Sequence, residues 1–405
     1  MTSGRILALS LLACVFIMEG FDIAAMGIAV PRLEDALGIP PASFGWVLTG
    51  ILVGLGVGGA TLAPLGDRFG RRTLIVAGCL ATGLFTLATP TAETTTMFLL
   101  WRFLTGIALG ACLPNISALS SELAPHRLRA TIMALVSAGI PVGLFAAGRT
   151  APAIIEAWGW QGLFWVPGGF ALLLAAILWL ILDGGSPAHT PDRAAEAEPA
   201  GRLPQLVLFA RPWAFPFAVF ATMLGLNALN LYLLNSWLPT VLPQAGMTLD
   251  DAARITGDAN LAGLAIGIAA SALVDNWRKG PALMLLFGAM GLSFLTIWLT
   301  APDQTRWTLL LMVGVGGANA GGMVLPGLAA HLFPAGLLSS AVGMGVLVAR
   351  LGAFAGPPLG AAMIAAEVPA QTFLGVAAIP ALACVLVALL VASALTVKAR
   401  VEAAA

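Results

Sequence analysis

The chain has 405 residues, of which 59% are hydrophobic and 9% are charged, and its 19 basic and 19 acidic residues cancel at pH 7. A soluble domain usually carries about 25% charged residues, so this composition excludes an ordinary soluble enzyme or binding module. The zero net charge and the lack of a basic tract argue against a nucleic-acid partner. A mean hydropathy of +0.96 instead requires an apolar solvent for most of the chain.

Twelve apolar runs follow one another, each close to the length of about 20 residues with which a helix crosses a bilayer. With short loops they use nearly the whole chain, so no soluble catalytic domain fits beside them and we expect no enzyme. The 4 cysteines and 3 histidines lack metal-ligand spacing, so we expect neither metal nor cofactor. The predicted transmembrane helices are 6–30, 43–65, 73–90, 97–123, 130–152, 161–182, 213–240, 255–274, 281–301, 307–332, 339–364 and 371–397.

The longest polar stretch, 183–211, contains four prolines and predicts a flexible cytoplasmic linker between two bundles, 1–182 and 212–405. Most of the 19 Lys and Arg residues fall in loops on the side that holds both termini, which places both termini in the cytoplasm. We therefore expect an all-α polytopic protein of the bacterial inner membrane. Its twelve transmembrane helices should form two pseudo-symmetric six-helix bundles in a monomer embedded in lipid.

A weak internal repeat supports the two bundles. Asp67 follows the second run and Asp275 follows the eighth, 208 residues later. The same shift takes the acidic positions 19 and 22 onto Asn227 and Asn230. Two halves of matching hydropathy are typical of a parallel six-helix repeat.

Two acidic residues, Glu19 and Asp22, lie near the middle of the first run. A charge at a helix centre costs at least about 2.5 kcal/mol on insertion scales, so such residues are functional candidates. A spacing of three puts both carboxylates on one face, where mutual repulsion and low dielectric favour proton uptake. We interpret them as proton-coupling residues. The alternative is a structural pair that a cation holds between helices.

Further polar side chains lie within other apolar runs, and we assign them to binding a small organic anion. Arg350, near the middle of the eleventh run, suits a carboxylate because a guanidinium donates two parallel hydrogen bonds. It could instead be the permanent partner of a first-helix acid. Arg102, in the fourth run, could pair with the same acids, draw anions inward or extend to the membrane surface. The remaining candidates are Asn227, Asn230, Asn319, Tyr232 and Trp237.

Each of these remaining candidates also has a structural interpretation. The asparagines could be ordinary polar contacts between helices. The aromatic residues Tyr232 and Trp237 could touch a ring-shaped ligand, or they could serve packing or the interfacial aromatic belt.

A compact charged cluster is predicted at the cytoplasmic surface, around the turn after the second run. An acid within a basic turn suggests a latch between helices, although ordinary positive-inside charges would also explain it. The residues of this predicted gate are Asp67, Arg68, Arg71, Arg72, Glu122, Arg127 and Arg129.

At these residues the chain resembles the major facilitator superfamily, and more closely its aromatic acid/proton symporters. Residues 63–72 resemble the superfamily's signature loop, with Ala63 in place of its usual first glycine. Residues 19–27 resemble the symporters' first-helix motif, whose first acid is usually Asp rather than Glu19. Further matches are 102–106 with 114–129, 232–240, 333–334 and 349–357.

The resemblance implies proton-driven uptake of an aromatic carboxylate by alternating access. It implies that Asp22 and Glu19 carry the coupling and that Arg102 and Arg350 are functional. The family's usual arginine after the Phe333-Pro334 step is Leu338 here. A proton-coupled drug or metabolite exporter of the same fold is the alternative. A non-transporting membrane receptor is disfavoured because no sizeable soluble output domain is present.

Overall fold

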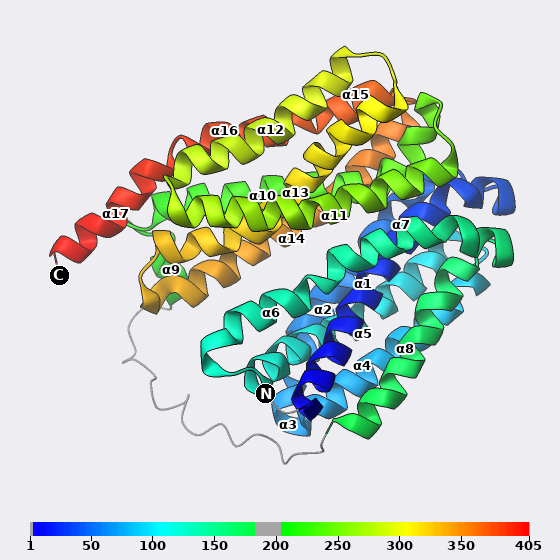
Figure 1. Ribbon diagram of the computed structural model, residues 1–405, viewed down its shortest axis with the longest axis horizontal. Helices are drawn as coiled ribbons and strands as arrows, with labels where there is room; N and C mark the ends of the chain where they lie inside the picture. Colours follow the sequence, from blue (N-terminus) through cyan, green and yellow to red (C-terminus); the bar gives the residue numbers. More distant parts are fainter. Residues whose placement is uncertain (1–2, 183–203, 405) are drawn as a thin grey trace. The chain divides into compact units, whose positions relative to one another are not determined.

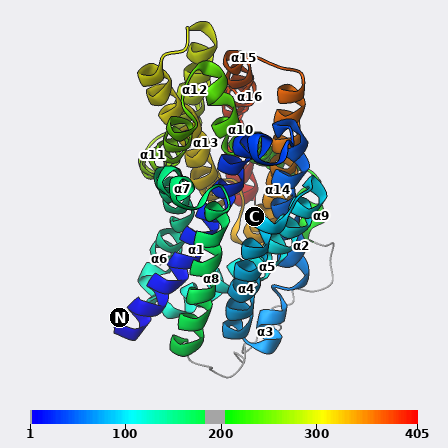
Figure 2. The ribbon, with the colours of Figure 1, turned by 90° about the vertical axis from the view of Figure 1, so that its right-hand side faces the viewer.

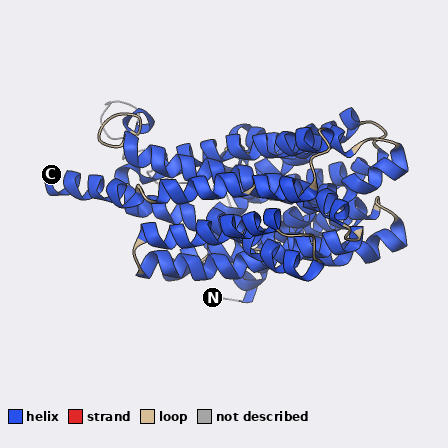
Figure 3. Cartoon of the chain, turned by 90° about the horizontal axis from the view of Figure 1, so that it is seen from above, coloured by secondary structure: helices blue, strands red, loops and turns tan. Residues whose placement is uncertain are grey.

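The computed structural model describes residues 3–182 and 204–404, and every regular element among them is a helix (Figure 3). Twelve of the helical segments in these ranges are long and apolar enough to cross a membrane, which confirms the predicted fold class. Part of the predicted linker, 183–203, lies outside the described residues. The described residues form two compact units. Unit 1 holds those of Met1–Pro191, Leu238–Pro243 and Thr248–Gly257, and unit 2 holds those of Asp192–Trp237, Gln244–Met247 and Asp258–Ala405.

The elements follow one another along the chain as in Figure 1. The first part of the chain contains α1 (Ser3–Leu37), η1 (Pro41–Phe44), α2 (Gly45–Thr61), α3 (Leu65–Phe69), α4 (Arg71–Ala88), η2 (Thr89–Thr91), α5 (Thr95–Leu123), η3 (His126–Leu128), α6 (Arg129–Ser137), α7 (Gly139–Trp158) and α8 (Gly162–Ile181). The second part contains α9 (Pro204–Val207), α10 (Ala214–Val241), η4 (Leu242–Ala245), α11 (Leu249–Asn276), α12 (Lys279–Leu299), α13 (Gln304–Leu332), α14 (Ala335–Ala365), α15 (Ala370–Val376), α16 (Ala378–Ala388) and α17 (Val391–Ala404).

Two of the twelve spans are broken where a proline enters the helix. Pro141 lies in the first turn of α7, and α6 ends four residues earlier at Ser137. Pro380 lies in the first turn of α16, and α15 ends four residues earlier at Val376. Proline has no N–H to donate to the carbonyl four residues back, so each helix is interrupted at that carbonyl. The apolar runs predicted these spans but not their breaks.

Helices α2 and α5 of unit 1 are in backbone contact through glycines. A Cβ atom added to Gly58 would lie 2.1 Å from the Ile107 carbonyl oxygen, and one added to Gly106 would lie 2.2 Å from that of Ile51. Small residues permit such close approach, which is the main source of packing energy between helices in lipid. The glycine-rich segment 54–59 therefore serves helix packing rather than ligand binding.

We expect Gly58→Ala to destabilise the protein because the added methyl group forces two backbones apart. The cost should be about 1–3 kcal/mol, the usual range for overpacking. Gly169→Ala in α8 is the matched control, because no atom lies within 4 Å of a Cβ added there. Thermal unfolding of the two purified variants in detergent measures the difference. Equal unfolding temperatures for the two variants would contradict the packing role of Gly58.

Glycine contacts also define how the two halves correspond. Gly139 and Gly143 of α7 meet the carbonyl oxygens of positions 13 and 17 in α1, and Gly352 and Gly356 of α14 meet those of positions 225 and 229 in α10. The offsets are 352 − 139 = 213 and 225 − 13 = 212. The first and seventh spans therefore correspond at 212 residues. The shift of 208 read from the sequence differs from this register by four residues, which is about one helical turn.

Candidate functional site

A buried ion pair joins α1 to α5 in unit 1. Asp22 lies close to the middle of α1, fully buried, and Arg102 of α5 is 1% exposed. Arg102 Nη1 donates to Asp22 Oδ1 at 2.9 Å, and its Nη2 donates to the Asp22 backbone oxygen at 3.0 Å. Thr86 of α4 donates to the same Oδ1 at 3.3 Å. Of the interpretations open for Arg102, the structure thus shows pairing with a first-helix acid.

Each partner of the pair has one buried polar atom outside the ion pair. Among the described residues, no group hydrogen-bonds to Asp22 Oδ2 or to Arg102 Nε, although both atoms are buried. A buried carboxylate is stabilised only while its cation stays in place, because both charges have lost their water. Asp22 Oδ2 therefore remains an open hydrogen-bond acceptor beside the ion pair.

The second acid of α1, Glu19, is also buried, with 4% exposed. It lies three residues before Asp22, so two carboxylates occupy one turn of the helix. Between them, a Cβ added to Gly20 would lie 2.0 Å from the Ile140 carbonyl oxygen. The start of α7 thus packs directly against the acidic turn of α1.

At one end of unit 1, an acid–base cluster ties α3, α4 and α5 together. Arg71 pairs with Glu122 and, at 3.6 Å, with Asp67. The turn is shaped by Gly70, whose φ of 89° lies in the left-handed region. Asn115 holds the preceding segment by donating to the Ala63 carbonyl oxygen at 3.0 Å. These contacts bring together three residues of the predicted gate.

The other predicted gate residues have different environments. Arg68 stacks on the neighbouring Phe69 ring at 5.5 Å. Arg72 lies 4.5 Å from the ring of Trp179 in α8 and donates to that residue's backbone oxygen. Arg127 and Arg129 are exposed, and neither forms an ion pair with a described residue.

A chain of three amides crosses unit 2. Asn319 of α13 donates to Asn260 Oδ1 of α11 at 2.9 Å, and Asn260 donates to Asn235 Oδ1 of α10 at 2.9 Å. Asn260 is fully buried, whereas Asn235 and Asn319 are half-buried. Three helices therefore present amide groups at one place, and this includes one of the predicted binding residues.

Two other predicted binding asparagines contact the backbone of neighbouring helices in unit 2. Asn227 donates to the Ala318 carbonyl oxygen at 3.0 Å. Asn230 donates at 2.8 Å to the carbonyl of Ala377, the residue at the break between α15 and α16. A break frees backbone acceptors that lipid cannot satisfy, so Asn230 stabilises the interrupted helix. Both asparagines thus make polar contacts between helices, and the side-chain oxygen of each has no hydrogen-bond partner among the described residues.

The remaining candidates differ in access. Trp237 is fully buried and donates from Nε1 to the Pro357 oxygen at 2.8 Å, so it packs within unit 2. Tyr232 is half-buried on the same helix. Arg350 is half-buried at the midpoint of α14, since (335 + 365)/2 = 350. Within the described ranges, no side chain forms an ion pair or hydrogen bond with its guanidinium group.

Sequence reasoning missed Thr86, Asn235 and Asn260 as members of these clusters. A lone threonine in an apolar run carries no signal, because it commonly bonds its own helix backbone. Asn235 and Asn260 were detectable as intramembrane amides, but only the tertiary fold connects them with Asn319. Among the described residues, no three His, Cys, Asp or Glu side chains are placed to hold a metal ion.

Comparison with known proteins relates the chain to membrane transporters in both sequence and fold. The sequence profile of the Major Facilitator Superfamily matches residues 12–332. The chain is 30% identical to the 3-(3-hydroxy-phenyl)propionate transporter of Escherichia coli (strain K12), covering 90% of this chain and 88% of that protein. It is 28% identical to the 4-hydroxybenzoate transporter PcaK of Pseudomonas putida, covering 86% and 84%. The fold resembles the inward-facing, unoccupied crystal structure of a bacterial homologue of the human lysosomal transporter Spinster, with a TM-score of 0.75, 16% identity and coverage of 99% and 98%.

Proposed function

Because the chain belongs to the Major Facilitator Superfamily, we propose that it imports a small aromatic carboxylate together with protons. The family and the relatives are transporters, which confirms that the protein is not an enzyme. With twelve spans and bacterial relatives, it is a multi-pass protein of the inner membrane. Both relatives are named for phenolic carboxylates, which supports an organic anion as the substrate.

The Asp22–Arg102 pair is the observation that carries the proposed coupling. A proton entering from the periplasm binds Asp22 Oδ2 and leaves a neutral carboxylic acid beside Arg102. The charge of Arg102 is then uncompensated within a buried region, where an unpaired ion is costly. Protonation therefore favours the arrival of an anion. When the proton leaves on the cytoplasmic side, Asp22 binds Arg102 again and the anion loses that advantage.

Arg350 supplies the proposed contact with the substrate carboxylate. It lies at the middle of its span, where superfamily transporters bind their substrates, and no described residue competes for it. A planar guanidinium matches a carboxylate with two parallel hydrogen bonds. The amide chain that ends at Asn235 and Asn319 supplies donors and acceptors for a ring hydroxyl.

Transport into proteoliposomes tests the proposal. With an acidic exterior, the protein should accumulate 4-hydroxybenzoate and 3-(3-hydroxyphenyl)propionate in the lumen. Weak acids also collect passively on the alkaline side, so protein-free liposomes provide the baseline. Accumulation driven only by an acidic lumen would identify an exporter that exchanges substrate for protons. Failure of both gradients to drive either acid above the baseline would reject proton-coupled transport of these compounds.

The cluster of Asp67, Arg71 and Glu122 should govern turnover rather than binding. It lies at a helix end, about 15 Å from the midplane by bilayer dimensions. We propose that it latches one state of the transport cycle at the cytoplasmic surface. Asp67→Asn should then lower turnover about fivefold, the effect of one partly exposed ion pair of about 1 kcal/mol.

Substrate affinity of Asp67→Asn, measured by titration of the purified protein, should stay unchanged. Glu156→Gln removes an exposed acid outside the cluster and is the matched control. A large loss of equilibrium affinity together with normal turnover would contradict the latch.

A further inference from the structure

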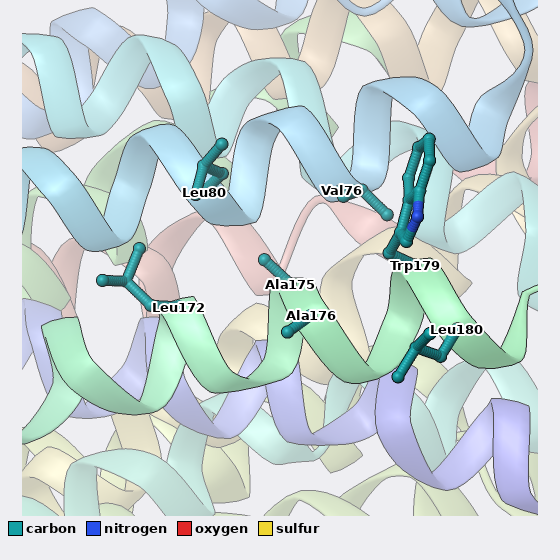
Figure 4. Close-up of a pocket in the computed structure, with 7 residues that line it drawn as sticks. All are labelled: Val76, Leu80, Leu172, Ala175, Ala176, Trp179 and Leu180. Carbon is teal, nitrogen blue, oxygen red and sulfur yellow. The ribbon is translucent and has the colours of Figure 1, made fainter.

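A groove on the outer face of unit 1 lies between α4 and α8, which are adjacent in Figures 1 and 2. Its volume is about 330 Å³. Figure 4 shows the seven side chains that line it, and all are apolar. They are Val76, Leu80, Leu172, Ala175, Ala176, Trp179 and Leu180.

The exposure of these side chains places the groove on the lipid-facing surface. Leu180 is 81% exposed, Trp179 55% and Leu80 47%. All three belong to helices long and apolar enough to span the membrane. In a bilayer such a surface faces the acyl chains of lipids.

One end of the groove carries a fixed positive charge. Arg72 lies one turn before Val76 on α4, and its guanidinium carbon is 4.5 Å from the Trp179 ring. The same side chain donates to the Trp179 backbone oxygen, which holds it beside the groove. Its Nε atom is buried without a hydrogen-bond partner among the described residues. Arg71, the neighbouring residue, is already paired with Glu122 and Asp67, so Arg72 supplies the charge at this end of the groove.

An apolar groove that ends at a fixed cation matches an amphiphile with an anionic head. We propose that this groove binds one anionic phospholipid, with an acyl chain between α4 and α8 and the phosphate on Arg72. Basic residues at the membrane surface recognise anionic headgroups through charge. Arginine adds directed hydrogen bonds to phosphate, which a half-buried guanidinium such as that of Arg72 can donate. This site is separate from the buried Asp22–Arg102 pair.

Native mass spectrometry of the delipidated protein, incubated with phosphatidylglycerol or phosphatidylcholine, tests this assignment. The wild type should retain phosphatidylglycerol in preference to phosphatidylcholine. Arg72→Gln should weaken phosphatidylglycerol retention about fivefold, the effect of one basic residue at an anionic lipid surface. Ala176→Phe should weaken it too, because the ring fills the groove from an exposed position that tolerates it.

Two controls change similar features elsewhere. Arg278→Gln removes an exposed basic residue next to Trp277, away from the groove. Leu173→Phe adds a ring on α8 at a residue that does not line the groove. Both should bind phosphatidylglycerol like the wild type, and size-exclusion chromatography confirms that each variant is folded.

Three results would overturn the proposal. Equal retention of the two lipids by the wild type would mean that the headgroup charge is not recognised. Normal phosphatidylglycerol binding by Ala176→Phe would mean that the lipid does not occupy the groove. Displacement of phosphatidylglycerol by 4-hydroxybenzoate would assign the groove to an aromatic acid instead.

Discussion

The Asp22→Asn variant should lose all substrate accumulation driven by a proton gradient. Asparagine has nearly the shape of a protonated aspartate, but its side-chain amide neither binds nor releases a proton near neutral pH. The proposed cycle would therefore stop at the step that returns Asp22 to its ion pair with Arg102. Exchange of labelled for unlabelled substrate needs no net proton movement and should persist.

Uptake into proteoliposomes with and without an acidic exterior measures the loss, and counterflow measures the exchange. Asp35→Asn is the matched control, because it removes an exposed acid from the same helix. Since Asn leaves Arg102 buried without a counter-charge, the single variant carries a folding cost of about 3–5 kcal/mol. Asp22→Asn with Arg102→Gln removes both charges and keeps the test valid if the single variant unfolds. Gradient-driven accumulation by either variant would show that Asp22 is not the coupling residue.

Arg350→Lys should weaken binding of an aromatic carboxylate by about 1–3 kcal/mol, the range for a hydrogen bond to a charged group, or about 5- to 150-fold. Lysine keeps the charge but loses the planar fork that meets both carboxylate oxygens. The affinity for a matched neutral amide should change much less. The competing role, permanent neutralisation of Asp22, is weakened because Arg102 already forms an ion pair with that carboxylate.

Titration of purified Arg350→Lys with 4-hydroxybenzoate and with 4-hydroxybenzamide decides the question. Arg306→Lys, at an exposed position at the start of α13, controls for the general effect of replacing arginine. If the acid and the amide lose affinity equally and the pH dependence of binding shifts, Arg350 does not contact the substrate carboxylate directly. It then has a partner within the protein.

The sequence was sufficient for features that depend on local composition. Apolar runs predicted all twelve spans, and the cost of burying charge singled out Asp22 and Arg102 before any partner was known. In both cases the apolar interior of the bilayer sets the requirement, so the residue types in one segment are enough to recognise it.

Features that depend on which helices are neighbours could not be predicted. Arg72 belongs to the same basic turn as Arg71, yet it stacks on Trp179, which is 107 residues away. Asn230 donates to the Ala377 carbonyl oxygen, and nothing in the sequence showed that Ala377 would lie at a break. The partners in both contacts are distant in sequence, so periodicity and spacing carry no information about them.

The glycine contacts have a consequence for how the two halves divide their work. When the first span is aligned with the seventh at the offset of 212 residues, Asp22 corresponds to Leu234. Gly54 and Gly106 correspond to Gly263 and Gly316, which meet in the same way at offsets of 209 and 210. By the latter offset Arg102 corresponds to Met312, so the buried ion pair of one half is matched by an apolar pair in the other.

The reverse also holds for the amide chain. In the same registers Asn235, Asn260 and Asn319 correspond to Ile23, Ile51 and Leu109, none of which is polar. Duplication of a six-helix ancestor accounts for shared backbone contacts that carry different chemistry. Under the proposed function, one half handles the proton and the other presents amides and an arginine to the substrate. A hybrid with two copies of the first half should therefore fold on the retained glycine contacts yet lack the residues that select a substrate.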